Sequence, residues 1–404
     1  MEYVVEIEKL DHQGRGICFT DGIITFVPNT LIGEKVKIKV IKNNKKIREA
    51  VVVNLLEKSN KRIDVKCNNL CGGCNLLHMS YEDELIYKEN KVKEIINKFT
   101  DLNINVVKKI IPNNECNYRN KATFQVKENI GFYKEKSYEI VPINECLLVD
   151  EKINKILKCL KQLNLNNVYQ IVVRTSKNYN ETMVVFKIRG KFNTDISLLK
   201  KIVDTVVLFD NEYKVLYGNG YIVDKIGNYS FVISPDSFFQ VNTNGAYNLY
   251  SKVLEYVENS NYLLDLYCGT GTIGIFLSNV CNKVLGVEIN KFAVKDAIKN
   301  KELNKINNIN FICKDASLFN EIDSFDTIVV DPPRSGLDKN TINYLLKISS
   351  KKIVYVSCDP VTLARDINLL NEKYDCLEIT PVDMFSRTYH VECVSVLHRK
   401  SLEK

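Results

Sequence analysis

The C-terminal part of the chain alternates between short apolar runs and longer amphipathic segments, and this alternation limits the possible folds more than any other feature. Runs that are apolar on both faces are typical of parallel strands buried between helices. A doubly wound α/β sheet is therefore predicted for residues 236–404. A helix is predicted at 244–258, and strands at 262–266, 283–287, 310–312, 327–330, 352–356 and 394–397.

One predicted strand leads directly to a cysteine. Cys358 follows the run 352–356 and precedes Asp359-Pro360, which cannot continue the strand. Cys358 is therefore expected at the carboxyl edge of the sheet, where open α/β folds bind their ligands. A cysteine at a strand end is commonly a small buried residue, whereas a thiol at a ligand edge can be a nucleophile. We interpret Cys358 as a nucleophile.

A glycine-rich turn follows the first predicted strand of this sheet. Gly269, Gly271 and Gly274 match the pattern G-x-G-x-x-G, which nicotinamide and flavin dinucleotide binders also share. Two carboxylates favour S-adenosylmethionine instead. Asp265 precedes the turn, where it could meet the amino group of a cationic ligand, and Glu288 ends the next strand, where a carboxylate can bind ribose hydroxyls. The remaining chain is also short for the second half of a dinucleotide fold.

The first 58 residues are expected to form a small OB-like barrel of five short strands separated by turns. Lys35, Lys37 and Lys39 alternate with apolar residues, which gives one strand a basic face. Residues 35–66 contain eleven Lys and Arg against three Asp and Glu, a net charge of +8 in a chain whose total is +7. A solvated lysine face is the simpler explanation, but such a concentration favours a nucleic-acid surface.

Three of the thirteen cysteines fall within one short loop, at Cys67, Cys71 and Cys74. Clustered thiols next to glycines are typical of a metal centre. A zinc site usually pairs two C-x2-C knuckles and no second knuckle is present, so an iron–sulfur cluster with one distant cysteine fits better. The candidates for the fourth ligand are Cys116, Cys146 and Cys159.

The remaining segments complete a three-domain organisation. Helices are predicted at 81–98 and about 150–163, and the rest of 104–235 is mainly strand-like, which indicates a central α+β domain. The expected domains are residues 1–58, 59–235 and 236–404. No apolar run has the length of a membrane span and the N-terminus lacks the pattern of a signal peptide, so we expect a monomeric cytoplasmic protein without membrane association.

Several motifs together resemble those of the RNA uracil-5-methyltransferases. They are the glycine turn, Asp331-Pro332-Pro333-Arg334-Ser335-Gly336, the segment 357–366 with the sequence SCDPVTLARD, and His390-Val391-Glu392. The resemblance covers essentially the whole chain, and its first domain is similar to a TRAM domain. It implies a Rossmann-like fold for the methyltransferase domain, S-adenosyl-L-methionine as cofactor and RNA as partner.

The resemblance also implies roles for individual residues. Cys358 is the implied nucleophile and Glu392 the implied base, with Asp331 beside the uracil and the cofactor. The implied cofactor-binding residues are Gln240, Tyr267, Thr272, Glu288, Asp315 and Asp331. The implied ligands of a [4Fe-4S] cluster are Cys67, Cys71, Cys74 and Cys146, although the interval Cys67-x3-Cys71 is shorter than the family's usual spacing.

The expected activity is methylation of carbon 5 of a uridine in structured RNA. The barrel and cysteine loop resemble the enzymes that act on 23S ribosomal RNA more than the shorter tRNA enzymes, so 23S rRNA is the favoured substrate. A T-loop uridine of tRNA is the alternative. A different class, a non-catalytic RNA-binding iron–sulfur protein, is disfavoured because Cys358 and Glu392 are both present.

Overall fold

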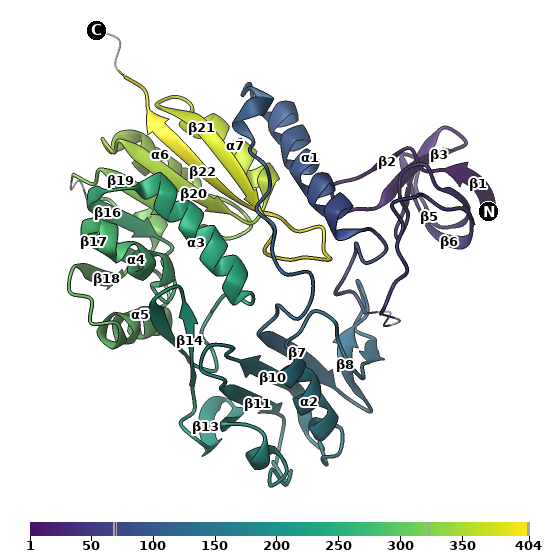
Figure 1. Ribbon diagram of the computed structural model, residues 1–404, viewed down its shortest axis with the longest axis horizontal. Helices are drawn as coiled ribbons and strands as arrows, with labels where there is room; N and C mark the ends of the chain where they lie inside the picture. Colours follow the sequence, from purple (N-terminus) through teal and green to yellow (C-terminus); the bar gives the residue numbers. More distant parts are fainter. Residues whose placement is uncertain (68, 70, 322–323, 402–404) are drawn as a thin grey trace.

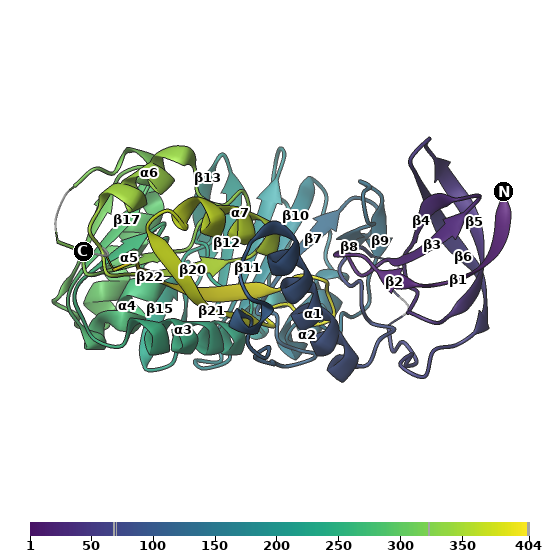
Figure 2. The same cartoon turned by 90° about the horizontal axis from the view of Figure 1, so that it is seen from above.

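The computed structural model describes residues 1–67, 69, 71–321 and 324–401. These residues form three large sheets, and a two-stranded hairpin lies between the second and the third in the sequence. Figures 1 and 2 show the N-terminal sheet set apart from the other two, which lie close together. A β unit, a mixed unit and an α/β unit thus follow one another along the chain.

The N-terminal sheet is built from six short strands. They are β1 (Glu2–Glu6), β2 (Lys9–Leu10), β3 (Gly16–Thr20), β4 (Ile23–Val27), β5 (Lys35–Asn43) and β6 (Ile47–Glu57), in the order β1-β5-β6-β4-β3-β2. In β5, Val36 and Ile38 are buried while Lys35 and Lys39 are exposed, which confirms the predicted alternation. An ion pair of 2.7 Å between Lys37 and Glu2 neutralises part of this basic face.

The central sheet has seven strands and one covering helix. The strands are β7 (Lys121–Val126), β8 (Ile130–Tyr133), β9 (Ile140–Pro142), β10 (Val168–Thr175), β11 (Thr182–Ile188), β12 (Thr205–Asp210) and β13 (Glu212–Tyr217), and the helix is α2 (Glu151–Leu160). Their order is β13-β12-β11-β10-β7-β8-β9. Ile153 and Leu157 of α2 pack with Phe124 of β7 in one hydrophobic cluster. The hairpin β14 (Ile222–Ile226) and β15 (Tyr229–Ile233) follows.

The C-terminal sheet also has seven strands. They are β16 (Ser260–Leu266), β17 (Cys281–Glu288), β18 (Ile309–Cys313), β19 (Thr327–Val330), β20 (Lys352–Ser357), β21 (Tyr374–Val382) and β22 (Glu392–Arg399). Their order is β18-β17-β16-β19-β20-β22-β21; β16 to β20 are parallel, and β22 is antiparallel to both of its neighbours. All six predicted strands are present. β21 was not predicted because it lacks a continuous apolar run and contains Pro381, which a strand at the sheet edge tolerates.

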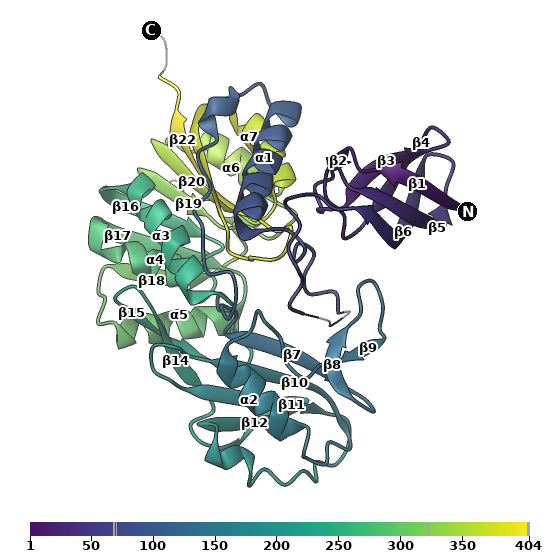
Figure 3. The same ribbon diagram turned by 45° about the vertical axis from the view of Figure 1, so that its right-hand side comes forward.

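Helices cover both faces of the C-terminal sheet. They are α1 (Tyr81–Phe99), α3 (Thr243–Val257), α4 (Thr272–Leu277), α5 (Lys291–Leu303), α6 (Lys339–Lys347) and α7 (Pro360–Leu370), and the described 3-10 turns are η1 (Ile104–Val106), η2 (Leu199–Lys201), η3 (Ser278–Val280) and η4 (Ala316–Leu318). α3 and α4 pack on one face, and α1, α6 and α7 on the other. Val92 and Ile96 of α1 lie in the same cluster as α7, and Figures 1 and 3 show these two helices side by side. The predicted helix at 81–98 is thus confirmed, and its packing partner is the C-terminal sheet.

In the part of the chain that the structure describes, no helix combines the length and the apolar character needed to cross a membrane.

Candidate active site

The turn between β16 and α4 leaves space at the carboxyl edge of the sheet. Gly271 has a φ of 77°, and a Cβ there would lie 2.5 Å from the Phe311 ring, so only glycine fits. Gly269 has a φ of 54°, but no atom lies within 4 Å of its Cβ position. Gly269 also lines the large cavity at this edge. A side chain at residue 269 would therefore extend into space that a ligand can use.

Cys358 lies in a tight turn between β20 and α7. The Asp359 carboxylate accepts a hydrogen bond from the Val361 amide (2.8 Å) and caps α7, and Pro360 occupies the first turn of the helix. The Ser357 hydroxyl accepts a hydrogen bond from the Asp359 amide (3.2 Å). The Ser-Cys-Asp-Pro sequence thus ends a strand and begins a helix, and Cys358 lies at the predicted carboxyl edge.

Strand pairing brings Glu392 next to Cys358. β20 and β22 are antiparallel with Ser357 opposite Cys393, so the residue after Ser357 and the residue before Cys393 meet at the same edge. The chain returns to this point through β21, whose last residue, Val382, pairs with Glu392. Two residues that the sequence predicted from separate motifs are therefore adjacent because the end of the sheet is antiparallel.

A cavity of about 1250 Å³ opens at this edge of the sheet. Of the eight residues predicted to be catalytic or to bind the cofactor, all except Asp315 line it: Gln240, Tyr267, Thr272, Glu288, Asp331, Cys358 and Glu392. The Asp315 carboxylate instead accepts a hydrogen bond from the Ser317 amide (2.9 Å) and caps η4. Burial and Asp338 raise the pKa of the cavity residue Tyr267 to about 12, and the charge of Asp315 adds the smallest contribution to this rise.

Two acidic groups of the cavity, Asp331 and Glu392, have pKa values raised toward neutral pH. Burial raises the pKa of Asp331 to about 7. Burial and the neighbouring Asp331 raise the pKa of Glu392 to about 8. Burial and then the charges of Glu392 and Asp331 raise the pKa of the Cys358 thiol to about 12, and Arg334 opposes this rise. The cavity therefore combines a protonated thiol with carboxyl groups that can gain and lose protons near pH 7.

The side of the cavity near the glycine turn is suited to a nucleoside. The two oxygens of Glu288 accept hydrogen bonds from the Gly269 amide (3.0 Å) and the Asn290 amide (2.7 Å), which fix the carboxylate at the end of β17. Each carboxylate oxygen has a further lone pair that can accept a hydrogen bond from a ribose hydroxyl. The hydroxyl of Thr272 lies 2.9 Å from that of Tyr250. These residues and the space beside Gly269 fit the ribose and adjoining groups of S-adenosylmethionine.

Asp265 has a different environment from the one predicted. Its side chain is fully buried and is not among the described residues that line the cavity. Its carboxylate accepts a hydrogen bond from the Gly274 amide (3.0 Å), and burial raises its pKa to about 8. One oxygen of Asp265 therefore holds the glycine turn, the other has no hydrogen-bond partner among the described residues, and the expected contact with a ligand's amino group stays a prediction.

Some cavity residues were not predicted because they come from other parts of the fold. Phe209 of β12 and Tyr213 of β13 belong to the central sheet and form one side of the cavity. Nothing in their local sequence marks them, since their position depends on how the two sheets pack. Phe385 lies in the loop between β21 and β22 and also lines the cavity. Phe385 could have been predicted as a cavity residue, because it lies close in sequence to the His390-Val391-Glu392 motif.

The predicted cluster ligands come together beside the central sheet. Asn68 and Leu70 of the cysteine loop lie outside the described residues. Burial and then the charges of Cys146, Cys71 and Cys67 raise the pKa of Cys74, so the four thiols lie close enough to affect one another. Within the described residues, however, no three His, Cys, Asp or Glu side chains are arranged to hold a metal ion.

Comparison with protein families identifies the chain. A family model described as tRNA (Uracil-5-)-methyltransferase matches residues 80–400, which include the cavity and the motifs around Cys358 and Glu392. The chain belongs to this uracil-5-methyltransferase family. A TRAM domain model matches residues 2–53, which confirms the resemblance of the N-terminal sheet to that domain. The protein is therefore an RNA methyltransferase with the fold of the S-adenosylmethionine-dependent enzymes.

Relatives of similar length support this assignment. A protein of Halalkalibacterium halodurans named as an uncharacterized RNA methyltransferase is 36% identical, and the alignment covers 98% of this chain and 97% of the relative. One of the same description from Clostridium tetani is 35% identical over 98% and 96% of the two chains. Among solved structures, the Pyrococcus abyssi tRNA (uracil-54, C5)-methyltransferase in complex with S-adenosyl-L-homocysteine is 30% identical, with a TM-score of 0.81 and coverage of 98% and 100%.

Proposed function

We propose that this uracil-5-methyltransferase acts through a covalent bond between Cys358 and carbon 6 of the target uracil. The main support is the position of Cys358 and Glu392 at paired strand ends, in the cavity that also contains the glycine turn. A thiol and a carboxyl group that face one cavity can serve as a nucleophile and a base on the same ring.

The reaction needs the thiol because carbon 5 of uracil is a weak nucleophile. The Cys358 thiol gives its proton to solvent water, and its sulfur forms a bond to carbon 6, so the electrons of the 5,6 double bond move into an enolate. Carbon 5 of the enolate can then accept a methyl group. The charge of Arg334 favours the thiolate, against the effects of burial and the two carboxyl groups.

Glu392 is the proposed base for the second half of the reaction. After methylation, carbon 5 carries both a proton and the methyl group. The Glu392 carboxylate takes that proton, the double bond re-forms, and the bond between carbon 6 and sulfur breaks to release Cys358. A pKa of about 8 for Glu392 lies near neutral pH, which suits a group that must accept and return a proton. Asp331, whose charge affects both residues, is proposed to lie beside the uracil and the methyl donor.

S-adenosyl-L-methionine supplies the electrophilic methyl group when it is bound. The residues proposed to hold it are Gln240, Tyr267, Thr272, Glu288 and Asp331, with Asp315 at the margin of the cavity. The support is the fixed Glu288 carboxylate and the open space beside Gly269. The related Pyrococcus abyssi enzyme was solved with S-adenosyl-L-homocysteine, which is the same molecule without the methyl group.

The proposed substrate is a uridine in 23S ribosomal RNA, with tRNA as a second candidate. The sequence favours ribosomal RNA because a TRAM domain and a cysteine loop accompany the methyltransferase domain. A specific observation favours tRNA: the solved relative that aligns with 98% of this chain is named as a tRNA (uracil-54, C5)-methyltransferase.

We also propose that Cys67, Cys71, Cys74 and Cys146 hold a [4Fe-4S] cluster. Four thiols near one another form a donor set that suits zinc or an iron–sulfur cluster. The sequence favours the cluster over zinc, because a zinc site usually pairs two C-x2-C knuckles and no second knuckle is present.

Methyl transfer from labelled S-adenosylmethionine tests the activity and the substrate together. The enzyme is incubated separately with 23S rRNA and tRNA transcripts, and we expect 5-methyluridine in the ribosomal transcript. Transfer only to tRNA would select the second candidate, and transfer to neither RNA would exclude both proposed substrates. Methyl transfer by Cys358→Ala at the wild-type rate would exclude the covalent route.

Anaerobic purification tests the cluster. We expect a brown protein that contains iron and sulfide and absorbs broadly in the visible range, and we expect Cys74→Ser to lose the colour. Stoichiometric zinc without iron would contradict the cluster assignment.

A further inference from the structure

The loop of residues 383–391 connects β21 to β22 and leads directly into Glu392. Its two flanking residues, Val382 and Glu392, face each other in the antiparallel pair. The loop also carries Phe385, which lines the cavity. The conformation of this loop therefore affects two groups of the proposed active site together.

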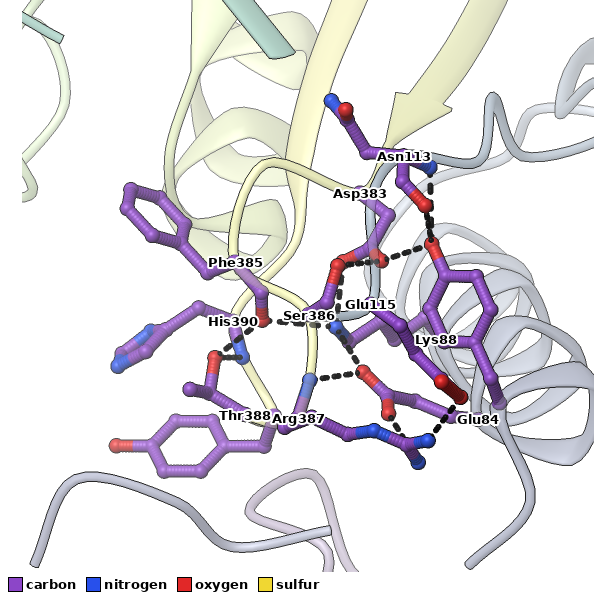
Figure 4. A network of polar contacts seen from close by, with 12 residues as sticks. Glu84, Lys88, Asn113, Glu115, Asp383, Phe385, Ser386, Arg387, Thr388 and His390 are labelled. Atoms are coloured by element: carbon purple, nitrogen blue, oxygen red, sulfur yellow. Dashed lines mark hydrogen bonds and ion pairs between the residues drawn. The ribbon is translucent and has the colours of Figure 1, made fainter. Parts of the chain in front are cut away.

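One face of α1 holds this loop through buried charged side chains. Glu84, Lys88 and Lys91 are spaced at i, i+4 and i+7, so they lie on the same side of the helix. All three are buried, with exposed fractions of 0%, 0% and 9%. A helix face at this spacing is normally apolar where it meets a core. The three charges therefore point to a specific partner, and Figure 4 shows Glu84 and Lys88 directed at the loop.

Lys88 binds the beginning of the loop. Its ammonium group lies 2.6 Å from a carboxylate oxygen of Asp383 and donates to the Phe385 carbonyl at 3.1 Å. It also pairs with Glu84 at 2.7 Å, so all three of its protons have acceptors. The other oxygen of Asp383 accepts hydrogen bonds from the hydroxyls of Ser386 (2.8 Å) and Tyr81 (2.7 Å). The residue that lines the cavity is thus bonded through its backbone to α1.

Glu84 and Lys91 bind the middle and the end of the loop. The Glu84 carboxylate accepts a hydrogen bond from the Arg387 amide at 2.7 Å. Lys91 donates to the Tyr389 carbonyl at 2.8 Å, close to Glu392 in the sequence. Three side chains of one rigid helix therefore fix three points of the loop, as Figure 4 shows for the first two.

The other side of the loop contacts the segments that precede and follow α1. Arg387 has a φ of 68°, in the left-handed region that a non-glycine residue adopts only when its surroundings require it. Its carbonyl accepts hydrogen bonds from the amides of Asn75 (3.0 Å) and Leu76 (3.2 Å), and its guanidinium donates to the Met79 carbonyl (2.8 Å) and to Glu115. The loop is therefore enclosed on both sides.

Burial of these charges is poorly explained by stability alone. An ion cluster that replaces apolar side chains in a buried contact often adds no net stability, because the cost of desolvation offsets the attraction between the charges. Such a cluster does select one arrangement, since any displacement leaves a buried charge without its partner. A buried ion cluster therefore suits a loop that must hold one conformation.

We propose that Glu84, Lys88 and Lys91 are positioning residues that hold the loop 383–391, and through it Phe385 and Glu392, in place for removal of the proton from carbon 5. This inference rests on the proposed roles of Cys358 and Glu392. It predicts that loosening the loop slows the step that needs Glu392 more than the step that needs Cys358.

The test compares Lys88→Met and Lys91→Met with Lys93→Met in the full-length enzyme. Lys93 lies on the same helix and pairs with Glu89 at the same i, i+4 spacing. Its side chain is partly exposed and, within the part of the chain that the structure describes, makes no hydrogen bond to the loop. Three quantities are measured: methyl transfer to the RNA substrate, the amount of covalent protein–RNA adduct on a denaturing gel, and hydrogen exchange of the amides in 383–391.

For Lys88→Met we expect faster exchange in the loop, methyl transfer reduced on the order of 10- to 100-fold, and a higher ratio of adduct to product. Lys91→Met removes one contact without leaving a carboxylate unpaired, so the same changes should be smaller, and Lys93→Met should match the wild type. If Lys88→Met does not fold, the same three measurements on Lys91→Met test the positioning role.

Two results would overturn the positioning role. One is unchanged exchange in the loop with an unchanged ratio of adduct to product. The other is a parallel loss of adduct and product in a folded variant, which indicates that the network only supports the fold or RNA binding. Absence of methyl transfer and adduct in the wild type would instead contradict the proposed function, and the exchange measurement would still test whether α1 holds the loop.

Discussion

Two regions of this molecule bury charged side chains, and they do so in opposite ways. Between α1 and the loop 383–391, Lys88 lies between Glu84 and Asp383, so a buried cation has two carboxylate partners within 2.7 Å. In the cavity, Glu392 has Asp331 as a neighbour of the same sign, and its pKa rises to about 8. Opposite charges fix a geometry, whereas neighbouring acids hold protons that are easily exchanged.

The sign of the neighbouring charge separates the residues proposed to position the loop from those proposed to react. Burial also raises the pKa of Glu84, but the charge of Lys88 opposes that rise. For Cys358, the carboxyl groups add to the effect of burial instead. Charge pairing is therefore a better guide to the reactive residues of this fold than burial alone.

The largest effect on methyl transfer is expected for Glu392, the proposed base in the cavity. Glu392→Gln keeps the size of the side chain but removes the base, so methyl transfer should fall on the order of 10²- to 10⁴-fold. Because Cys358 remains, the methylated base should stay attached, and a protein–RNA adduct should accumulate on a denaturing gel. Methyl transfer at the wild-type rate without an adduct would show that another group takes the proton.

The next effect concerns the paired charges. Lys88→Met leaves the buried Asp383 carboxylate without its cation and leaves Glu84 only Arg387 at 3.5 Å, so the free energy of unfolding should fall by about 3–5 kcal/mol. Urea denaturation of the purified protein measures this loss. A loss below about 1 kcal/mol would mean that water or a local rearrangement replaces the ammonium group, and the distinction between the two regions would weaken.

The pH dependence of stability should differ between the wild type and Glu392→Gln. The folded protein keeps the Glu392 proton up to a pKa of about 8, whereas an unfolded chain loses it near the ordinary value of 4.5. Burial of the neutral acid is therefore favourable at low pH, and this contribution is lost as the pH rises through 8. Since one pKa unit corresponds to ~1.4 kcal/mol, the difference amounts to a few kcal/mol.

Urea midpoints of both proteins at about pH 5 and about pH 9 test this prediction. The wild type should lose more stability over this interval than Glu392→Gln. Equal losses in the two proteins would show that Glu392 ionises normally in the folded state.

The smallest effect is expected for Lys93→Met. Its ion pair with Glu89 is partly exposed, so water and salt screen it, and its removal should change the free energy of unfolding by less than about 0.5 kcal/mol. The same urea measurement applies. A change as large as that of Lys88→Met would show that any charge on α1 matters, regardless of its partner.

Much of the C-terminal domain could be predicted because its signals are local. Continuous apolar runs identified the parallel strands, and the change from strand to Asp359-Pro360 located Cys358 at the edge where the structure has it. β21 escaped prediction because polar residues and Pro381 interrupt its apolar positions, so it has no such run. The hydrogen bond between Asp265 and the Gly274 amide could not be predicted, because a position before a turn does not reveal which backbone amide a carboxylate will accept from.

The sequence by itself determined which groups are present: a thiol at a strand end, a carboxylate after His390-Val391, a glycine turn and a loop of cysteines. Only the tertiary structure decided which of them meet. Glu392 reaches Cys358 because β22 runs antiparallel to β20, and Lys88 reaches Asp383 across 295 residues. Long-range contacts of this kind leave no local pattern, since a lysine that faces water and a lysine that is paired in a core look the same in a helix sequence.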